Sequence, residues 1–219
     1  VAPLPELARL NKERELIGIY LSAHPLDEYE FILRYVCSTS CLTLKDLKPL
    51  SGNDVTFGGL ITAVREGQSR RGSPFTIISI EDYTGSVELA FFGEDSVNYG
   101  KFARIGLSIF VRGQVQEKRY REGEYEIKVS SMNLLSEMKD KLVTKITLNI
   151  PIGNIDKTVI SELSSVIKNN PGNSLLYFQI IGEDVSSNIE LFSRSTKLEV
   201  NKKVIDYLKD NININFKIN

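Results

Sequence analysis

Alternating apolar and polar residues between Val55 and Leu135 predict β-strands, because successive side chains of a strand point to opposite faces. Strands are expected at residues 55–65, 75–81, 86–92, 107–118 and 125–134. Turn-forming residues such as Gly72, Pro74 and Gly85 stand between them. Residues 94–104 lose the period of two and are expected to form a short helix or a looped connection. The segment therefore predicts one closed sheet of five strands with an insertion after the third.

Three strands, a helical insertion and two further strands are typical of the five-stranded Greek-key barrel called the OB-fold. Gly58 and Gly59 in the first predicted strand agree with this fold, because a small barrel bends that strand sharply and glycine relieves the crowding. OB-fold barrels bind oligonucleotides on the face of the second and third strands, between the first-to-second and fourth-to-fifth loops. The fold therefore favours nucleic-acid binding.

Basic and aromatic residues gather in and beside those two loops of the predicted barrel. Cations pair with phosphates and rings stack on bases, which are the two requirements of single-strand binding. The predicted nucleic-acid-binding residues are Arg65, Arg70, Arg71, Phe75, Phe92, Arg112, Lys118, Arg119, Tyr120 and Arg121. The period of two leaves open whether Phe75 and Phe92 point outward or into the core.

Net charge argues against strong binding to nucleic acid. Residues 54–135 contain ten lysines and arginines against eleven aspartates and glutamates, a net charge of −1. Such a surface does not attract DNA by bulk charge, so binding is expected to be weak. A barrel that binds protein instead of nucleic acid is the alternative.

Composition is ordinary for a globular protein, with 219 residues, 42% hydrophobic and 25% charged. No apolar run is long enough to span a membrane, and the start of the chain lacks both a signal peptide and a Met, which predicts a fragment of a longer chain. The two cysteines, Cys37 and Cys41, are expected to be reduced thiols of a cytoplasmic protein. His24 is the one histidine and is expected to cap a helix end through last-turn carbonyls. No metal site, cofactor or catalytic set is predicted.

Helical and mixed segments flank the predicted barrel. Residues 5–22 and 27–35 have helical periodicity, and residues 1–53 are expected to form a helical lead-in. After the barrel domain (54–135), the charged residues 136–141 are predicted to link to a domain at 141–219. That domain is expected to have strands at 143–150, 175–182, 188–194 and 213–218, and helices at 155–168 and 202–209. The predicted fold class is α+β with an all-β core and a small βαββαβ two-layer C-terminal domain.

The lead-in carries a family resemblance. Residues 12–26 run from a Glu-rich helix into Tyr20-Leu21-Ser22-Ala23-His24-Pro25, and resemble the segment before the OB domain in the alpha subunit of bacterial replicative DNA polymerase III. The family usually has Gly where this chain has Ala23. Further matching stretches are residues 55–64, 71–74 and 80–88, and Gly113.

The resemblance implies a non-catalytic fragment, because the polymerase palm and its catalytic aspartates lie upstream in that family. It implies that the barrel binds single-stranded template DNA, and that the C-terminal domain docks the clamp-loader tau subunit within the replisome. A further alternative is the OB anticodon-binding appendage of an aminoacyl-tRNA synthetase. The roughly 80 residues after the barrel are too few for the catalytic domain which that alternative needs.

Overall fold

The computed structural model describes residues 24–70, 72–119, 121–182, 188–211 and 213–218. They form two compact units: the described part of Val1–Tyr29 with Cys37–Met138, and Glu30–Val36 with the described part of Lys139–Asn219. The helix predicted at residues 5–22 lies outside the described residues. Within the described ranges, no helix is long and apolar enough to cross a membrane.

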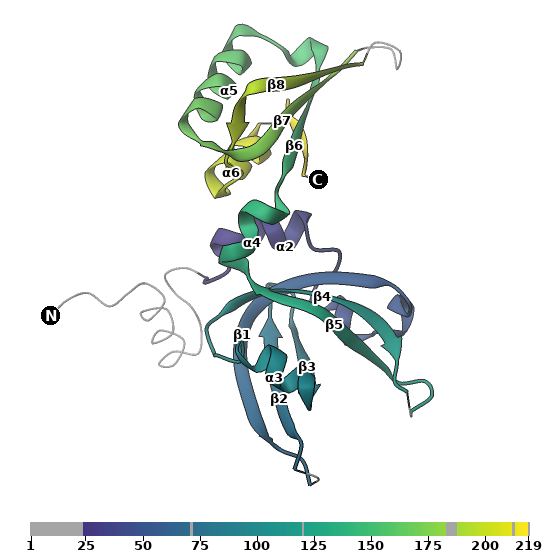
Figure 1. Ribbon diagram of the computed structural model, residues 1–219. Helices are drawn as coiled ribbons and strands as arrows, with labels where there is room; N and C mark the ends of the chain where they lie inside the picture. The colour runs from purple at the N-terminus through teal and green to yellow at the C-terminus, as the bar shows by residue number, and fades with distance from the viewer. Residues whose placement is uncertain (1–23, 71, 120, 183–187, 212, 219) are drawn as a thin grey trace, which may run out of the picture. The chain divides into compact units, whose positions relative to one another are not determined.

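The first unit contains a five-stranded antiparallel sheet with the strand order β3-β2-β1-β4-β5 (Figure 1). Its elements are β1 (Asp54–Gln68), β2 (Pro74–Glu81), β3 (Ser86–Phe92), α3 (Glu94–Gly100), β4 (Ser108–Glu117) and β5 (Tyr125–Leu134). The predicted OB-fold is confirmed, including the helix after the third strand. The sheet is not closed, however, because β3 and β5 are its two edges in the described residues.

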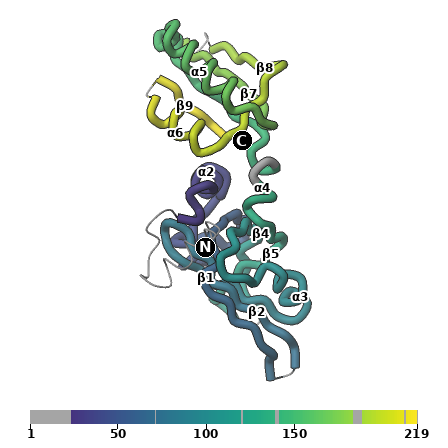
Figure 2. The backbone as a smooth tube through the Cα atoms, turned by 90° about the vertical axis from the view of Figure 1, so that its left-hand side faces the viewer, coloured from purple at the N-terminus to yellow at the C-terminus, as the bar shows by residue number. Residues whose placement is uncertain are grey.

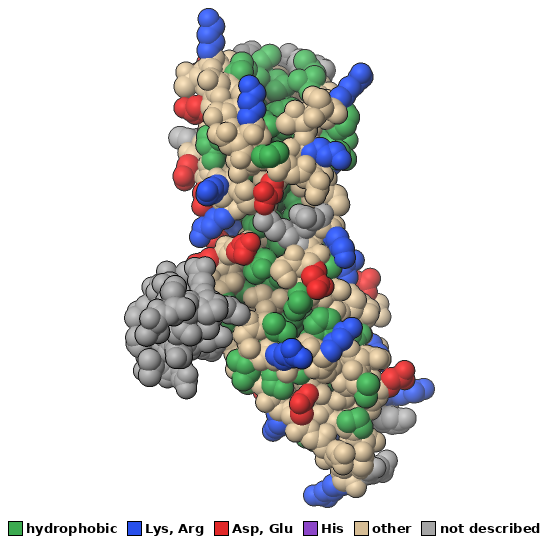
Figure 3. Space-filling model, turned by 60° about the vertical axis from the view of Figure 1, so that its left-hand side comes forward, with side chains coloured by type: hydrophobic (Ala, Val, Ile, Leu, Met, Phe, Trp, Pro, Cys, Tyr) green, Lys and Arg blue, Asp and Glu red, His purple; other side chains and the backbone are tan. Residues whose placement is uncertain are grey.

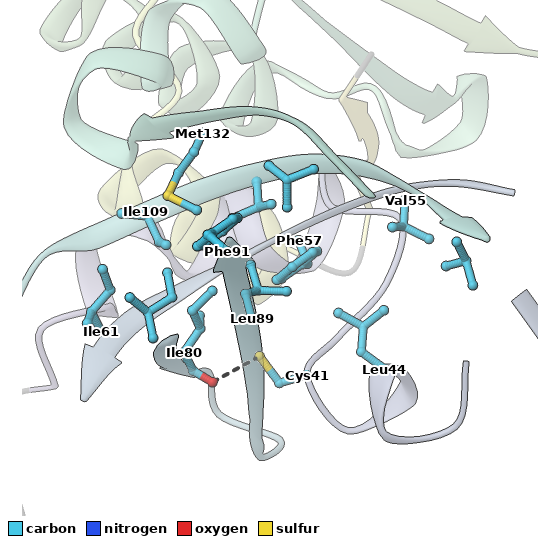
Figure 4. Packing of buried hydrophobic residues seen from close by; sticks show 14 residues of the cluster. Cys41, Leu44, Val55, Phe57, Ile61, Ile80, Leu89, Phe91, Ile109 and Met132 are labelled. Atoms are coloured by element: carbon cyan, nitrogen blue, oxygen red, sulfur yellow. Dashed lines mark hydrogen bonds between the residues drawn. The ribbon is translucent and has the colours of Figure 1, made fainter. Parts of the chain in front are cut away.

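The lead-in segment covers the core of the barrel on the side where β3 and β5 do not pair. Cys41 is fully buried and Leu44 is 2% exposed, and both belong to the barrel's hydrophobic cluster. Figure 4 shows them beside strand residues such as Ile80 and Leu89, with the Cys41 Sγ donating to the Ile80 carbonyl oxygen. The lead-in consists of η1 (Asp27–Tyr29), α2 (Glu30–Tyr35), η2 (Thr43–Lys45) and η3 (Lys48–Leu50). Two of these short helices, η2 and η3, therefore build one wall of the barrel.

Strand β1 bends so that it pairs with β4 through its first half and with β2 through its second half. A register shift between Ile61 and Ala63 marks the bend. Gly59 lies just before it, and a Cβ at this position would stand 2.5 Å from the Glu81 carbonyl oxygen. A glycine is needed there because the two strands approach so closely.

The second unit contains a four-stranded sheet of order β8-β7-β6-β9, in which β6 and β7 are parallel (Figures 1 and 2). Its elements are β6 (Lys145–Pro151), η4 (Ile152–Asn154), α5 (Lys157–Asn169), β7 (Pro171–Ile181), β8 (Ile189–Leu198), α6 (Lys202–Asp210) and β9 (Asn215–Ile218). The predicted βαββαβ order is confirmed. Both helices begin with a side-chain cap: Asp156 accepts from the Val159 amide and Asn201 from the Val204 amide.

Two details differ from the sequence prediction. The expected charged linker forms α4 (Leu135–Leu142), because Leu135 and Leu142 stand seven residues apart and both are buried. Strand β7 begins at Pro171, four residues before the strand expected at 175–182, because Pro171 already pairs with Leu198. Proline is compatible with a first strand position, where no amide hydrogen is required.

Candidate nucleic-acid interface

The outward face of β1, β2 and β3 carries an aromatic pair. In the register of these strands, Gly67, Phe75 and Phe92 form one row across the sheet. The neighbouring row begins with Arg65, which is exposed. Inward-facing neighbours such as Phe91 belong to the buried core, so the alternation of the strands directs this row to the outside.

Phe92 is 62% exposed, while Phe75 is half-buried. Their ring centroids lie 6.5 Å apart with the planes tilted by 43°. A Cβ on Gly67 would stand 2.8 Å from the Phe75 ring, so the ring occupies space that any other residue at position 67 would fill. The half-buried Phe75 ring packs beside the Phe92 ring, and the exposed Phe92 ring is accessible to a flat ligand such as a base.

A groove of ≈ 810 Å³ lies in the first unit on the side where β3 and β5 are unpaired. One wall is the lead-in with Lys45 and Lys48, and the opposite wall is the β4–β5 hairpin with Lys118 and Arg121. Phe92 belongs both to the groove and to the aromatic pair. The other lining residues are Leu44, Asp46, Leu47, Val87, Glu88, Leu89, Ala90, Gly123, Tyr125, Glu126 and Ile127.

Glu124 neutralises part of the hairpin's charge. Its carboxylate lies 2.9 Å from the Lys118 Nζ and 3.3 Å from an Arg121 guanidinium nitrogen. The hydrogen bonds from Lys118 and then Arg121 lower the pKa of Glu124 below its ordinary value. A phosphate that contacts either cation therefore competes with a carboxylate already in place.

The remaining predicted residues are spread around the barrel. Arg70 is exposed at the β1–β2 turn, and Arg119 is exposed in the β4–β5 hairpin. Arg112 stands over the Phe110 ring, 5.6 Å from its centroid, and does not line the groove. Arg71 and Tyr120 lie outside the described residues. Lys45, Lys48 and Tyr125 were not predicted, because their place in the groove depends on how the lead-in packs on the barrel.

The cysteines and the histidine have local structural surroundings. Burial, with the Asp82 carboxylate nearby, raises the pKa of both Cys37 and Cys41 to about 12, so neither thiol is a nucleophile at neutral pH. His24 accepts a hydrogen bond at Nδ1 from the Leu26 amide, at 3.2 Å. The ring thus caps the start of the following turn. The helix whose last-turn carbonyls it was expected to bond lies outside the described residues, so that expectation stays a prediction. Among the described residues, no group of three or more potential metal ligands is present.

Comparisons with known proteins agree with both units. The family model described as "OB-fold nucleic acid binding domain" matches residues 55–135, and that described as "DNA polymerase III alpha subunit, C-terminal domain" matches residues 146–219. A mitochondrial single-stranded DNA binding protein from S. cerevisiae is 18% identical, with 39% of this chain and 97% of that chain covered. Its TM-score of 0.30 is too low to bear on function.

Curated relatives named DNA polymerase III subunit alpha match most of the chain. The protein of Haemophilus influenzae is 28% identical over 181 residues, and that of Escherichia coli K12 is 27% identical over 182 residues. In both cases 81% of this chain is covered, and the chain spans about 15% of the relative's length. The resemblance predicted from the sequence is thereby confirmed: this chain is similar to the C-terminal region of bacterial DNA polymerase III alpha subunits, with an OB-fold nucleic acid binding domain followed by the family's C-terminal domain.

Proposed function

We propose that the barrel binds single-stranded template DNA during replication, weakly and without sequence preference. The observation that carries this proposal is the aromatic pair of Phe75 and Phe92 on the outward face of β2 and β3, with the exposed Arg65 in the adjacent row. A ring accepts any base by stacking, and a neighbouring cation attracts the phosphate, so this combination needs no particular sequence. Fluorescence anisotropy with labelled oligonucleotides of different sequence tests it: similar affinities are expected for all of them.

The charge distribution supports weak binding. Lys and Arg side chains are scattered among Asp and Glu side chains on the face that Figure 3 shows, and they form no continuous basic stripe there. Most of the affinity then comes from stacking and from a few phosphate contacts. The same neutrality favours a second candidate function, in which the barrel binds a protein and not DNA.

Substitution of Glu124 tests whether the cations of the β4–β5 hairpin contact DNA. Glu124→Gln removes the carboxylate that pairs with Lys118 and Arg121, so both cations become available to phosphate. We expect tighter binding of single-stranded DNA and a steeper dependence on salt, by about 0.7 in the log–log slope for each additional phosphate contact. The measurement is anisotropy at several salt concentrations, with Glu122→Gln in the same hairpin as the control for loss of one negative charge. Equal gains in the two variants would contradict a specific role for Glu124.

We infer that the second unit docks a protein, the clamp-loader tau subunit, as other alpha subunits of this family are expected to do. The unit is nearly neutral, with ten basic and eight acidic residues between positions 141 and 219, which fits a protein partner better than DNA. Exposed apolar side chains at the β7–β8 hairpin, Ile181, Ile189, Leu191 and Phe192, offer contact area. The proposal includes no catalysis by this fragment, further contacts with replisome subunits and a cytoplasmic location.

Deletion of residues 141–219 is expected to abolish tau binding and leave DNA binding by the barrel in place. Loss of tau binding is measured with purified tau on the immobilised full chain and on the immobilised deletion variant. Circular dichroism checks that the barrel of the deletion variant remains folded. Retained tau binding by the deletion variant would contradict a docking role of the second unit.

A further inference from the structure

We propose that the groove between β3 and β5 continues the DNA path beyond the aromatic pair, with Lys45 and Lys48 of the lead-in binding the phosphates there. This inference rests on the proposed function of the barrel and adds a second stretch of contact. It assigns a binding role to a segment that precedes the first strand of the barrel. The ligand is the phosphodiester backbone of the same single strand that stacks on Phe92.

Hydrogen bonds from backbone amides of the lead-in to side chains of the barrel hold the lead-in in place, so its lysines have defined positions. The Cys41 amide donates to the Asp82 carboxylate at 2.9 Å, and the Leu42 amide donates to the Thr84 hydroxyl at 3.1 Å. Asp82 and Thr84 belong to the turn between β2 and β3. With the buried side chains of Cys41 and Leu44, these bonds place η2 and η3 along the free edge of β3. Positions set in advance reduce the entropy lost when a ligand binds.

Lys45 and Lys48 are both exposed and form no ion pair with any other described residue. The Lys45 stem lies against the turn, with its Cε 3.6 Å from where a Cβ of Gly85 would stand. The two cations of the opposite wall, Lys118 and Arg121, already pair with Glu124. The lysines of the lead-in are therefore the cations of this groove that meet a phosphate without displacing a carboxylate.

The groove contains three carboxylates as well, which keeps the expected binding modest. Asp46 accepts from the Lys48 amide, Glu88 from the Ser79 hydroxyl and Glu126 from the Gln116 side-chain amide. Four cations and three carboxylates line the groove, and Glu124 beside Lys118 and Arg121 makes the charge balance even. The volume of the groove, ≈ 810 Å³, lies within the roughly 300–1,000 Å³ typical of ligand sites.

Continuity with the aromatic pair identifies the occupant. Phe92 is the last residue of β3 and lines the groove, while its ring faces Phe75 on the outward face. Lys45 lies by Gly85, at the other end of β3 from Phe92, which is about 20 Å away at about 3.3 Å per residue. A strand whose base stacks on Phe92 therefore reaches the lead-in after several nucleotides, by following the groove along the edge of β3. A single strand fits this course, because its backbone bends freely between stacked bases, whereas a duplex is stiff over such distances.

The test compares the full chain with the double variant Lys45→Ala/Lys48→Ala, using fluorescent oligothymidines of about four and about twelve nucleotides. We expect the variant to bind the short oligonucleotide as the parent does, and to bind the long one with a log–log salt slope lower by about 1.4, from about 0.7 for each of two phosphates. The parent's advantage on the long oligonucleotide then shrinks about sevenfold between about 50 and 200 mM salt. Exposed charges contribute little to stability, so the variant is expected to remain folded.

The control variant is Lys202→Ala/Lys203→Ala, which removes the same charge from exposed positions of α6 in the second unit. It is expected to match the parent on both oligonucleotides. Equal slopes for the lead-in variant and the parent would overturn the inference and leave the proposed function intact. Absence of any binding by the parent at low salt would overturn both.

Discussion

Truncation of Leu163 to alanine is expected to lower the free energy of unfolding of the second unit by about 2–5 kcal/mol. Leu163 lies on α5 and is 7% exposed, so its removal leaves a cavity against the sheet. Ile160→Ala on the same helix is the matched control, because Ile160 is 54% exposed and its loss opens no cavity. Chemical denaturation of both variants, followed by circular dichroism, measures the difference. Equal destabilisation by the two substitutions would mean that α5 presents a different face to the sheet.

Phe92→Ala is expected to weaken single-stranded DNA binding by about 1–3 kcal/mol, which corresponds to about 5- to 150-fold in affinity. The ring is 62% exposed, so its removal costs the fold little and the loss reports on stacking. Phe92→Trp retains a flat aromatic surface and is expected to keep parental affinity. Val97→Ala serves as the control for loss of an exposed apolar side chain in the same unit, because Val97 is 71% exposed on α3. Parental affinity in the Phe92→Ala variant would argue that no base rests on this ring.

Local patterns were sufficient for most strands of the barrel. The bounds of β3 and β5 follow directly from the period of two and from the turns beside them. The end of β1 was placed too early, at Arg65, because the residues after it are polar or glycine. Strand β1 continues to Gln68 since it pairs with β2 in a long hairpin, as far as Pro74. A sequence pattern reports burial, whereas a solvent-exposed hairpin end is held by backbone pairing alone.

The candidate site was predicted less completely than the fold. Alternation requires Phe91 and Phe92 to point to opposite sides, but it does not decide which of them is buried. The structure places Phe91 in the core at 5% exposure and Phe92 outside. The pairing of Glu124 with two predicted cations depends on side-chain geometry within the hairpin. The place of Lys45 depends on the packing of a distant segment, for which the sequence carries no periodic signal.

The central claim, that the barrel binds single-stranded DNA through a few phosphate contacts, is tested most directly by a salt titration. Anisotropy of a labelled oligonucleotide is recorded at several salt concentrations with the parent and with Arg70→Ala/Arg71→Ala. For about four phosphate contacts, we expect the logarithm of the affinity to fall with the logarithm of the salt concentration with a slope near −3, at about 0.7 for each phosphate. The double variant is expected to show a flatter slope in a barrel that is still folded. No binding at low salt, or identical slopes for the two proteins, would contradict this claim and favour a barrel that binds protein.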